Sequence, residues 1–405
     1  MEGKGTPDLR RAPGRGADRR RRLVRRRGLL DRIVRRGGAP VVYGNRVEVF
    51  EKGRAAYEAM LDAIEAAAAG IAVEMYTWAD DRVGRRFAER LRRQALRGIP
   101  VRILVDAFGS LGSEDLMASL EQAGAQVRWF HPLAPWAPSW YPNRRDHRKL
   151  VLVDGATGFV GGTNLAEEYT EEFRGERAWR DLTLRIEGPA AREMVRLFLG
   201  TWIRSGGRPE DAAGLFAVPQ DAGGAGVQVV GGTGVLGRRG LRRSYLGMIG
   251  MARRRIFLAN AYFAPEGPLR RALARAASRG VRVELLLPGD SDVPMVRWAG
   301  RACYGRLLDE GVRIREARGT FLHAKVAVFD DEVLLAGSAN LDHRSFRHNL
   351  EIAVNVFEAA AAQTALATFE REFEAAREVT LEEWRRRPRS ERLRERLARL
   401  VRYWL

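Results

Sequence analysis

The hydrophobic residues of this chain alternate between two periods. Apolar side chains recur at helical spacing over residues 57–64, and the apolar run IAVEMYTW that follows at 71–78 is typical of a buried strand. A second set at helical spacing precedes another apolar run, VRILVDAFG, and consists of Val83, Phe87 and Leu91. The pattern therefore predicts strand, helix and strand in succession.

The same succession returns in the second half of the chain. The run IFLANAYF begins at Ile256, and the helical segment GPLRRALARAASRG and the run VRVELLLPG follow it. Parallel strands are usually joined by a right-handed crossover helix, so the repeat predicts two similar α/β lobes. We expect a basic flexible arm at 1–40, a first lobe at 41–204, a Gly- and Pro-rich linker at 205–226, a second lobe at 227–378 and a basic amphipathic helix at 379–405.

Composition limits the compartment and the partners. The chain has 405 residues, more than the ~250 to 300 at which single cores stop growing, which agrees with two lobes. The single cysteine, Cys303, excludes an internal disulfide, and we expect a reducing cytoplasm. A net charge of +19 favours a nucleic acid, an anionic membrane or a phosphorylated substrate. Because no apolar run approaches the ~20 residues of a spanning helix, we expect any membrane contact to be peripheral.

One motif occurs twice at the same spacing, in HRKLVLVDGATGFVGGTN and in HAKVAVFDDEVLLAGSAN. Each copy has a His, a Lys two positions later and an Asp five positions after the Lys, namely His147, Lys149 and Asp154 and then His323, Lys325 and Asp330. The two lysines stand out because the chain has 70 Lys and Arg residues but only four lysines. If the motif occurred once, its histidine could simply be a structural residue of the core. Two histidines followed by Lys and Asp at the same spacing make that explanation a poor one.

These residue types suit a phosphoryl group. Residues i and i+2 of a strand share a face, so each His projects together with its Lys. Two such strands facing each other would place two imidazoles and two ammonium groups around one phosphorus atom, and the compact Lys charge can follow a centre whose geometry changes. Asp154 and Asp330 each end an apolar strand, where Asp commonly stabilises a turn, and we favour that role for both.

The doubled motif resembles the phospholipase D superfamily. The segments RDHRKLVLVDGATGFVGGTNLAEEY, WRDLTLRIEGPA, ANAYFAPEGPLRRAL and GSANLDHRSFRHNLE are similar to bacterial cardiolipin synthases of the type without N-terminal membrane spans. The resemblance implies two phospholipase D-like α/β/α sandwich lobes, with the active site at their interface and no metal or other cofactor. One departure is Gly162, where Ser is usual and where the second copy has Ser338.

The family's chemistry is a two-step exchange through a phosphohistidine. The resemblance implies that His147 is the nucleophile and His323 the acid and base, although the near symmetry of the lobes leaves their order open. It implies that the nonbridging oxygens are held by Lys149, Lys325, Asn164 and Asn340, with Ser338 as a further phosphate-binding residue. Asp154 and Asp330 complete the family's catalytic motif.

Two carboxylates are expected to orient the imidazoles. Asp181 and Glu351 each lie on a strand that follows a motif, and a catalytic imidazole needs an acceptor on its second nitrogen. The resemblance implies that these two residues are the acceptors. A surface salt bridge is the alternative for each.

The termini are basic. Arginines alternate with apolar residues in the last segment, where one helical face carries Leu393, Leu397, Leu400, Val401 and Trp404. Such a helix is typical of an anchor at a lipid surface, and also of a helix docked on its own protein. The arm at 1–40 is either a solvated tail or a segment that binds acidic lipid.

The predicted function is transfer of a phosphatidyl group to phosphatidylglycerol by a cytoplasmic enzyme on the inner face of the cell membrane. The donor, phosphatidylglycerol or phosphatidylethanolamine, and the oligomeric state stay open. The alternatives are a phospholipase D that hydrolyses phospholipid to phosphatidic acid, a nuclease of the superfamily, and a nucleic-acid-binding module. Intact His and Lys in both copies argue against the last, and no obligatory nucleic acid is expected.

Overall fold

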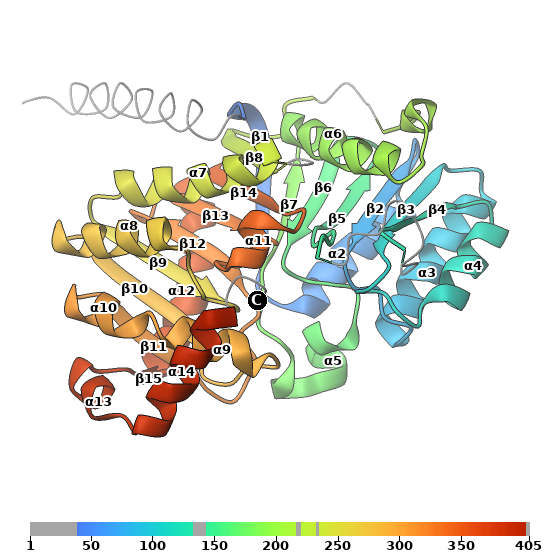
Figure 1. Ribbon diagram of the computed structural model, residues 1–405. Helices are drawn as coiled ribbons and strands as arrows, with labels where there is room; N and C mark the ends of the chain where they lie inside the picture. The colour runs from blue at the N-terminus through green and yellow to red at the C-terminus, as the bar shows by residue number, and fades with distance from the viewer. Residues whose placement is uncertain (1–38, 133–142, 216–219, 232–234, 402–405) are drawn as a thin grey trace, which may run out of the picture.

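A computed structural model describes residues 39–132, 143–215, 220–231 and 235–401 of the chain. The predicted N-terminal arm lies outside these ranges except for its last two residues. Within them the protein is an α/β structure built on one large mixed sheet, and Figure 1 shows its two halves side by side. The α/β fold class with two similar lobes is confirmed.

The first half contributes strands β1 to β7. The strands are β1 (Val42–Phe50), β2 (Ile71–Met75), β3 (Val101–Asp106), β4 (Gln126–Phe130), β5 (Lys149–Val153), β6 (Thr157–Gly161) and β7 (Thr183–Glu187). The α-helices are α2 (Gly53–Glu65), α3 (Arg82–Leu96), α4 (Glu114–Gln122), α5 (Glu171–Arg174) and α6 (Pro189–Arg204).

The second half repeats this order and adds a short strand at its edge. The strands are β8 (Ala225–Gly231), β9 (Arg255–Asn260), β10 (Arg282–Pro288), β11 (Arg313–Ala317), β12 (Lys325–Phe329), β13 (Val333–Gly337), β14 (Ile352–Phe357) and β15 (Arg377–Glu378). The α-helices are α7 (Val235–Met251), α8 (Gly267–Ser278), α9 (Pro294–Arg301), α10 (Tyr304–Asp309), α11 (His343–Arg347), α12 (Ala359–Ala375), α13 (Leu381–Arg386) and α14 (Arg389–Val401).

The strand order of one half mirrors that of the other. The order is β15-β11-β10-β9-β12-β13-β14-β8-β1-β7-β6-β5-β2-β3-β4, with β8 and β1 antiparallel at the centre. In each half three strands run parallel, and the motif strand pairs antiparallel with the first of them. This register sets Lys149 opposite Met75 and Lys325 opposite Asn260, so both motifs begin where the first parallel strand of their half ends.

Helices cover both faces of the sheet. On one face α6 and α12 bury Phe198, Trp202, Phe369 and Phe373 in a core that is common to both halves. On the other face α2, α3 and α4 pack over the first half, and α7, α8 and α10 pack over the second. The three layers follow from the amphipathic spacing of these helices and the almost fully apolar parallel strands.

The two halves also meet at the starts of their strands. Isolated parallel bridges join Asp146 to Leu350 and Arg180 to Leu322. The first bridge precedes β5 and β14, and the second precedes β7 and β12. The segments that lead into both motif strands are therefore held against the opposite half.

Two predicted segments differ from expectation. Within the linker expected at 205–226, the Trp202 indole donates to Asp211 at 2.9 Å, Leu215 is buried and β8 already begins at Ala225. The single helix expected at 379–405 is divided into α13 and α14 at Pro388. Proline disfavours a helical conformation in the residue before it, which explains the break after α13. No helix within the described ranges is long and apolar enough to cross a bilayer.

Candidate active site

Both motif histidines lie two residues before their strands, at the junction of the halves. The backbone N–H of His147 donates to the oxygen of Leu350 at 3.0 Å, and that of His323 donates to the oxygen of Arg180 at 2.8 Å. Each acceptor belongs to the opposite half. Both side chains are buried, so the junction fixes the two imidazoles in a site largely shielded from water.

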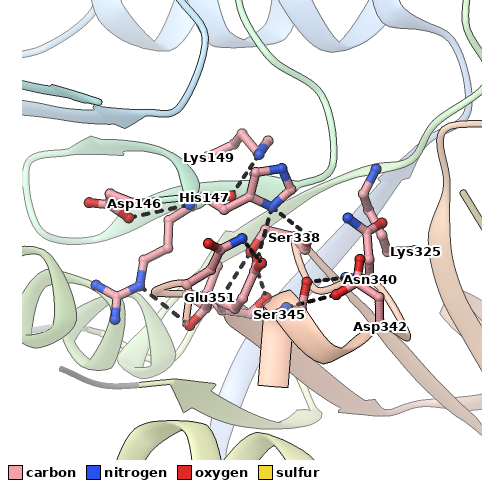
Figure 2. Close-up of polar contacts among 12 residues, drawn as sticks. Asp146, His147, Lys149, Lys325, Ser338, Asn340, Asp342, Ser345 and Glu351 are labelled. Carbon is pink, nitrogen blue, oxygen red and sulfur yellow. Dashed lines mark hydrogen bonds and ion pairs between the residues drawn. The ribbon is translucent and has the colours of Figure 1, made fainter. Parts of the chain in front are cut away.

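Glu351 holds the imidazole of His147. Nδ1 of His147 lies 3.1 Å from Oε2 of Glu351. That oxygen also accepts a hydrogen bond from the Ser338 hydroxyl at 2.5 Å, and the Asn349 amide donates to Oε1 at 3.3 Å. Figure 2 shows Glu351 and Ser338 below the His147 ring. With Nδ1 held by the carboxylate, Nε2 is the nitrogen left for chemistry.

Asp181 is the corresponding partner of His323. Its Oδ2 lies 2.6 Å from Nδ1 of His323, and its Oδ1 accepts the backbone N–H of Leu182 at 2.8 Å. The two pairs are crossed, because each motif histidine contacts a carboxylate from the other half. The sequence suggested both carboxylates but gave no sign of the crossing.

Gly162, which stands where Ser is usual, lies against Asp181, the shorter of the two carboxylate side chains. A Cβ atom on Gly162 would lie 2.3 Å from Oδ2 of Asp181, so any larger residue would displace this carboxylate. At the equivalent position in the second half, Ser338 donates its hydroxyl to the longer Glu351. The exchange of Ser for Gly therefore accompanies the exchange of Glu for Asp.

Both lysines lie beside the histidines. Lys149 Nζ donates to the backbone oxygen of His147 at 2.6 Å, and Lys325 Nζ lies 3.7 Å from Oδ2 of Asp181. Burial lowers the pKa of Lys149 to about 7 and that of Lys325 to about 8, although nearby carboxylates oppose the shift. The site thus holds two ammonium groups that titrate near neutral pH.

Charges from each half act on the histidine of the other. Burial lowers the pKa of His147 to about 4, and burial with the charges of Lys325, Lys149 and His147 holds the pKa of His323 well below its usual value. Burial raises the pKa of Asp181 to about 6. Burial also pushes the pKa of Glu351 upward, but His147, Lys149 and Ser338 together hold it below its usual value. The two pairs are therefore electrostatically unequal.

The predicted phosphate-binding amides differ in their contacts. Asn164 donates to the Tyr169 hydroxyl at 2.8 Å and accepts the backbone N–H of Thr77 at 3.2 Å. The side-chain oxygen of Asn340 is buried and has no hydrogen-bond partner within the described part of the chain. Of the two amides, that of Asn340 is the more available to a substrate. Phosphate binding by Asn164, Asn340 and Ser338 stays a prediction.

Asp154 and Asp330 lie at the opposite ends of β5 and β12 from the histidines. Both have a φ of +53°, a region that Asp tolerates. The Asp154 carboxylate accepts the backbone N–H groups of Ala68, Ala69 and Gly70, just before β2, and the Asp330 carboxylate accepts those of Arg253, Arg254 and Arg255, at the start of β9. The structure thus gives these residues no contact with the histidines and ties each to a turn.

We expect Asp330→Ala to destabilise the protein without slowing its chemistry. Three backbone N–H groups lose an acceptor, which lowers the free energy of unfolding by about 1–3 kcal/mol. Urea denaturation measures the loss, and Asp330→Asn, which tolerates the positive φ, is expected to lose less. A large fall in the rate per folded molecule at unchanged stability would contradict this role.

Sequence reasoning missed the aromatic residues around the histidines. The Tyr76 ring lies 4.8 Å from the His147 ring, and the Tyr169 and Trp179 rings each lie 5.3 Å from the His323 ring. Tyr262 follows at 6.3 Å. Tyr76 comes directly after β2 and Tyr262 two positions after β9, but the repeat does not align them, because Tyr76 corresponds to Ala261.

Arg148, between the motif His and Lys, was also missed. Its fully buried guanidinium forms an ion pair with Glu74 at 3.2 Å and donates to the Thr201 hydroxyl at 2.8 Å. Its Nε lies 3.4 Å from the backbone oxygen of Glu351. The second copy has Ala324 at the equivalent position, so this support for Glu351 exists on one side of the site alone.

Comparison with solved structures identifies the architecture. The phosphatidylserine synthase of Haemophilus influenzae superposes on 93% of this chain and 100% of its own, with a TM-score of 0.71 at 16% identity. The polyphosphate kinase of Porphyromonas gingivalis covers 80% of this chain and 46% of its own, with a TM-score of 0.53 at 16% identity. The fold is thus a two-lobed α/β architecture that these proteins share.

Sequence relatives narrow this class to a family. The family described as cardiolipin synthase, PLD-like domain, matches residues 60–202 and 245–374. The cardiolipin synthase of Geobacillus thermodenitrificans is 33% identical over 93% of this chain and 75% of its own length, and the major cardiolipin synthase ClsA of Bacillus subtilis is 30% identical over 92% and 78%. The chain belongs to the cardiolipin synthase family of phospholipase D-like proteins, which confirms the predicted family.

Proposed function

We propose that the protein is a phosphatidyltransferase of the cardiolipin synthase type, which moves a phosphatidyl group onto phosphatidylglycerol through a phosphohistidine. The observation that supports this best is the crossed arrangement, in which both imidazoles are held by carboxylates from the opposite half. One imidazole can then bind phosphorus while the other handles the alcohol proton. The family membership supports the phosphatidyl group as the unit transferred.

In the first step Nε2 of His147 attacks the phosphorus atom of the donor lipid. A P–N bond forms, the P–O bond to the headgroup alcohol breaks, and the alcohol leaves with a proton from His323. The anionic phosphodiester favours the protonated form of His323, because a nearby negative charge raises the pKa of an imidazole. Glu351 stabilises the positive charge that develops on His147.

In the second step the hydroxyl of phosphatidylglycerol displaces the histidine. His323 takes the proton from this hydroxyl, a new P–O bond forms and the P–N bond breaks, which restores His147. Lys149 and Lys325 place positive charge where the nonbridging oxygens gain negative charge in each transition state. Water in place of the lipid hydroxyl would give phosphatidic acid instead.

We expect kcat/KM to fall as the pH rises through about 7 to 8. Lys149, with a pKa of about 7, and Lys325, with a pKa of about 8, lose their charge in this range and no longer stabilise the transition state. His147, with a pKa of about 4, is already neutral there, so its own titration does not contribute to this alkaline limb. Measurement of kcat/KM with a soluble phosphodiester from about pH 5 to 9 tests this. A value of kcat/KM that is constant to pH 9 contradicts it.

The proposal is tested with full-length protein and vesicles of defined lipids. Vesicles of phosphatidylglycerol alone, and of phosphatidylglycerol with phosphatidylethanolamine, are analysed by mass spectrometry for cardiolipin and for phosphatidic acid. Cardiolipin as the main product supports transfer and identifies the donor. Phosphatidic acid as the main product would make the enzyme a hydrolase, and absence of both would reject the proposal. We further propose that the enzyme acts at the cytoplasmic face of the membrane.

A further inference from the structure

Helix α14 docks on the protein through a polar stripe. Arg301 of α9 lies 3.1 Å from Glu391 and 3.8 Å from Glu395, and Glu395 also pairs with Arg387 at 2.8 Å. Ala398 completes the stripe and is 1% exposed, in a small cluster with Val296 of α9. These three positions of α14, spaced by four and three residues, define its inner face.

The leucines of α14 lie on the opposite face. Leu393, Leu397 and Leu400 repeat the same spacing two residues further on, which rotates them by about 200° around the helix. They are 58%, 55% and 78% exposed. A surface helix normally buries its apolar stripe and exposes its charges, and α14 does the reverse. We call these three residues the leucine face.

The leucine face is close to the candidate active site. The N-terminal part of α14 contacts Arg301 at the end of α9, and Ala398 belongs to one apolar cluster with Val296 near the start of α9, so the two helices run antiparallel. The C-terminal leucines therefore lie toward the start of α9, where Val293 and Met295 are also exposed. Figure 1 shows α9 and α14 beside the space between the two halves.

A short chain of contacts joins this region to His323. Asp292, immediately before Val293, accepts the Tyr262 hydroxyl at 2.7 Å. The Tyr262 ring lies 6.3 Å from the His323 ring, and Tyr262 also packs against the cluster that contains Ala398. The segment that carries the exposed apolar residues is thus one contact away from a side chain of the site.

Positive charge borders the leucine face. Residues 389–401 contain five arginines and two glutamates, and both glutamates point to the docked side. Arg389, Arg392 and Arg396 are exposed. An apolar stripe bordered by arginines matches a bilayer surface with anionic headgroups, where leucines enter the acyl boundary and arginines meet phosphates.

We propose that the leucine face, together with Val293 and Met295, rests on an anionic lipid bilayer and holds the active site at the membrane surface. This rests on the proposed function in one respect, since a lipid substrate gives the nearby site a reason to lie against a bilayer. The surface is assembled from α9 and α14, with the charged stripe of α14 fixing the leucines outward. A second copy of this chain is the other possible occupant and is an outcome of the test.

The test uses full-length protein that carries His147→Ala, so that lipids are bound without turnover. Co-sedimentation with vesicles of phosphatidylglycerol and of phosphatidylcholine is compared for this protein and for the triple variant Leu393→Gln, Leu397→Gln and Leu400→Gln. The matched control is Leu96→Gln, because Leu96 is 62% exposed at the end of α3, before β3 begins and thus away from the site. We expect the triple variant to bind phosphatidylglycerol vesicles at least about tenfold more weakly, and the control to bind as the parent does.

Activity separates surface binding from chemistry. With His147 intact, the triple variant is expected to lose activity on vesicles by a similar factor and to retain it on a soluble phosphodiester. Unchanged vesicle binding by the triple variant overturns the proposal, and so does a change from dimer to monomer in light scattering with vesicle binding unaffected. If the leucines govern binding but the parent forms no cardiolipin, the proposed function fails and the lipid surface stands.

Discussion

His147→Ala is expected to abolish phosphatidyl transfer, with a loss of about 10⁴-fold or more, because His147 forms the bond to phosphorus in the proposed mechanism and His323 handles the alcohol proton. Mutation of His323 to Ala is expected to give a different defect. The nucleophile and Glu351 remain in place, so attack on phosphorus is possible, but the departing alcohol receives no proton. Loss of a general acid costs about 10²- to 10⁴-fold with a poor leaving group.

A nitrophenyl phosphodiester distinguishes these two defects, because nitrophenolate leaves without a proton. In His323→Ala we expect one burst of nitrophenol and a phosphorylated protein whose label is stable to base and labile to acid, as phosphoramidates are. In His147→Ala we expect neither. His348→Gln is the control, since this histidine is outside the crossed pairs and should leave both measurements unchanged. A burst in His147→Ala with none in His323→Ala would reverse the assigned roles.

The sequence carried enough information to predict the two motif strands. The repeated spacing of His147, Lys149, His323 and Lys325 predicts two equivalent strands, and the register against β2 and β9 agrees with that repeat. The crossing of Asp181 and Glu351 was beyond reach, because it depends on the bridges between the halves. Such contacts join positions far apart in the chain and leave no periodic pattern.

The orientation of α14 is a second feature that the sequence pattern did not determine. The spacing of Leu393, Leu397 and Leu400 gave an amphipathic face, and two explanations for it stayed open. The structure combines a docked helix with an exposed apolar face, because Arg301 engages Glu391 and Glu395 on the other side of α14. Ion pairs between distant segments decide the orientation of the helix, and helical spacing alone does not record them.

Glu351→Gln and Asp181→Asn are expected to impair different steps because the two carboxylates are crossed. Glu351 holds Nδ1 of His147, and an amide in its place no longer stabilises the cation that forms there. We expect a loss of about 10²- to 10⁴-fold with both lipid and nitrophenyl substrates. Asp181 holds His323, so its replacement slows protonation of the alcohol, and with the nitrophenyl substrate the loss largely disappears from the burst phase, which reports the first step.

The leaving-group dependence is the decisive measurement, since a purely structural defect would lower both rates alike. Ser338→Ala serves as a graded comparison, because it removes one hydrogen bond from Glu351 and keeps the carboxylate itself. It should show the pattern of Glu351→Gln at a smaller magnitude. If the nitrophenyl substrate rescued Glu351→Gln and failed to rescue Asp181→Asn, each carboxylate would serve the step here assigned to the other.

The two carboxylates also differ in acidity before any substrate binds. The pKa of Asp181 is raised to about 6 and that of Glu351 is lowered, so Glu351 loses its proton more readily than Asp181. Glu351, the carboxylate with the lowered pKa, contacts the histidine that becomes a cation in the proposed mechanism, which favours transfer through His147.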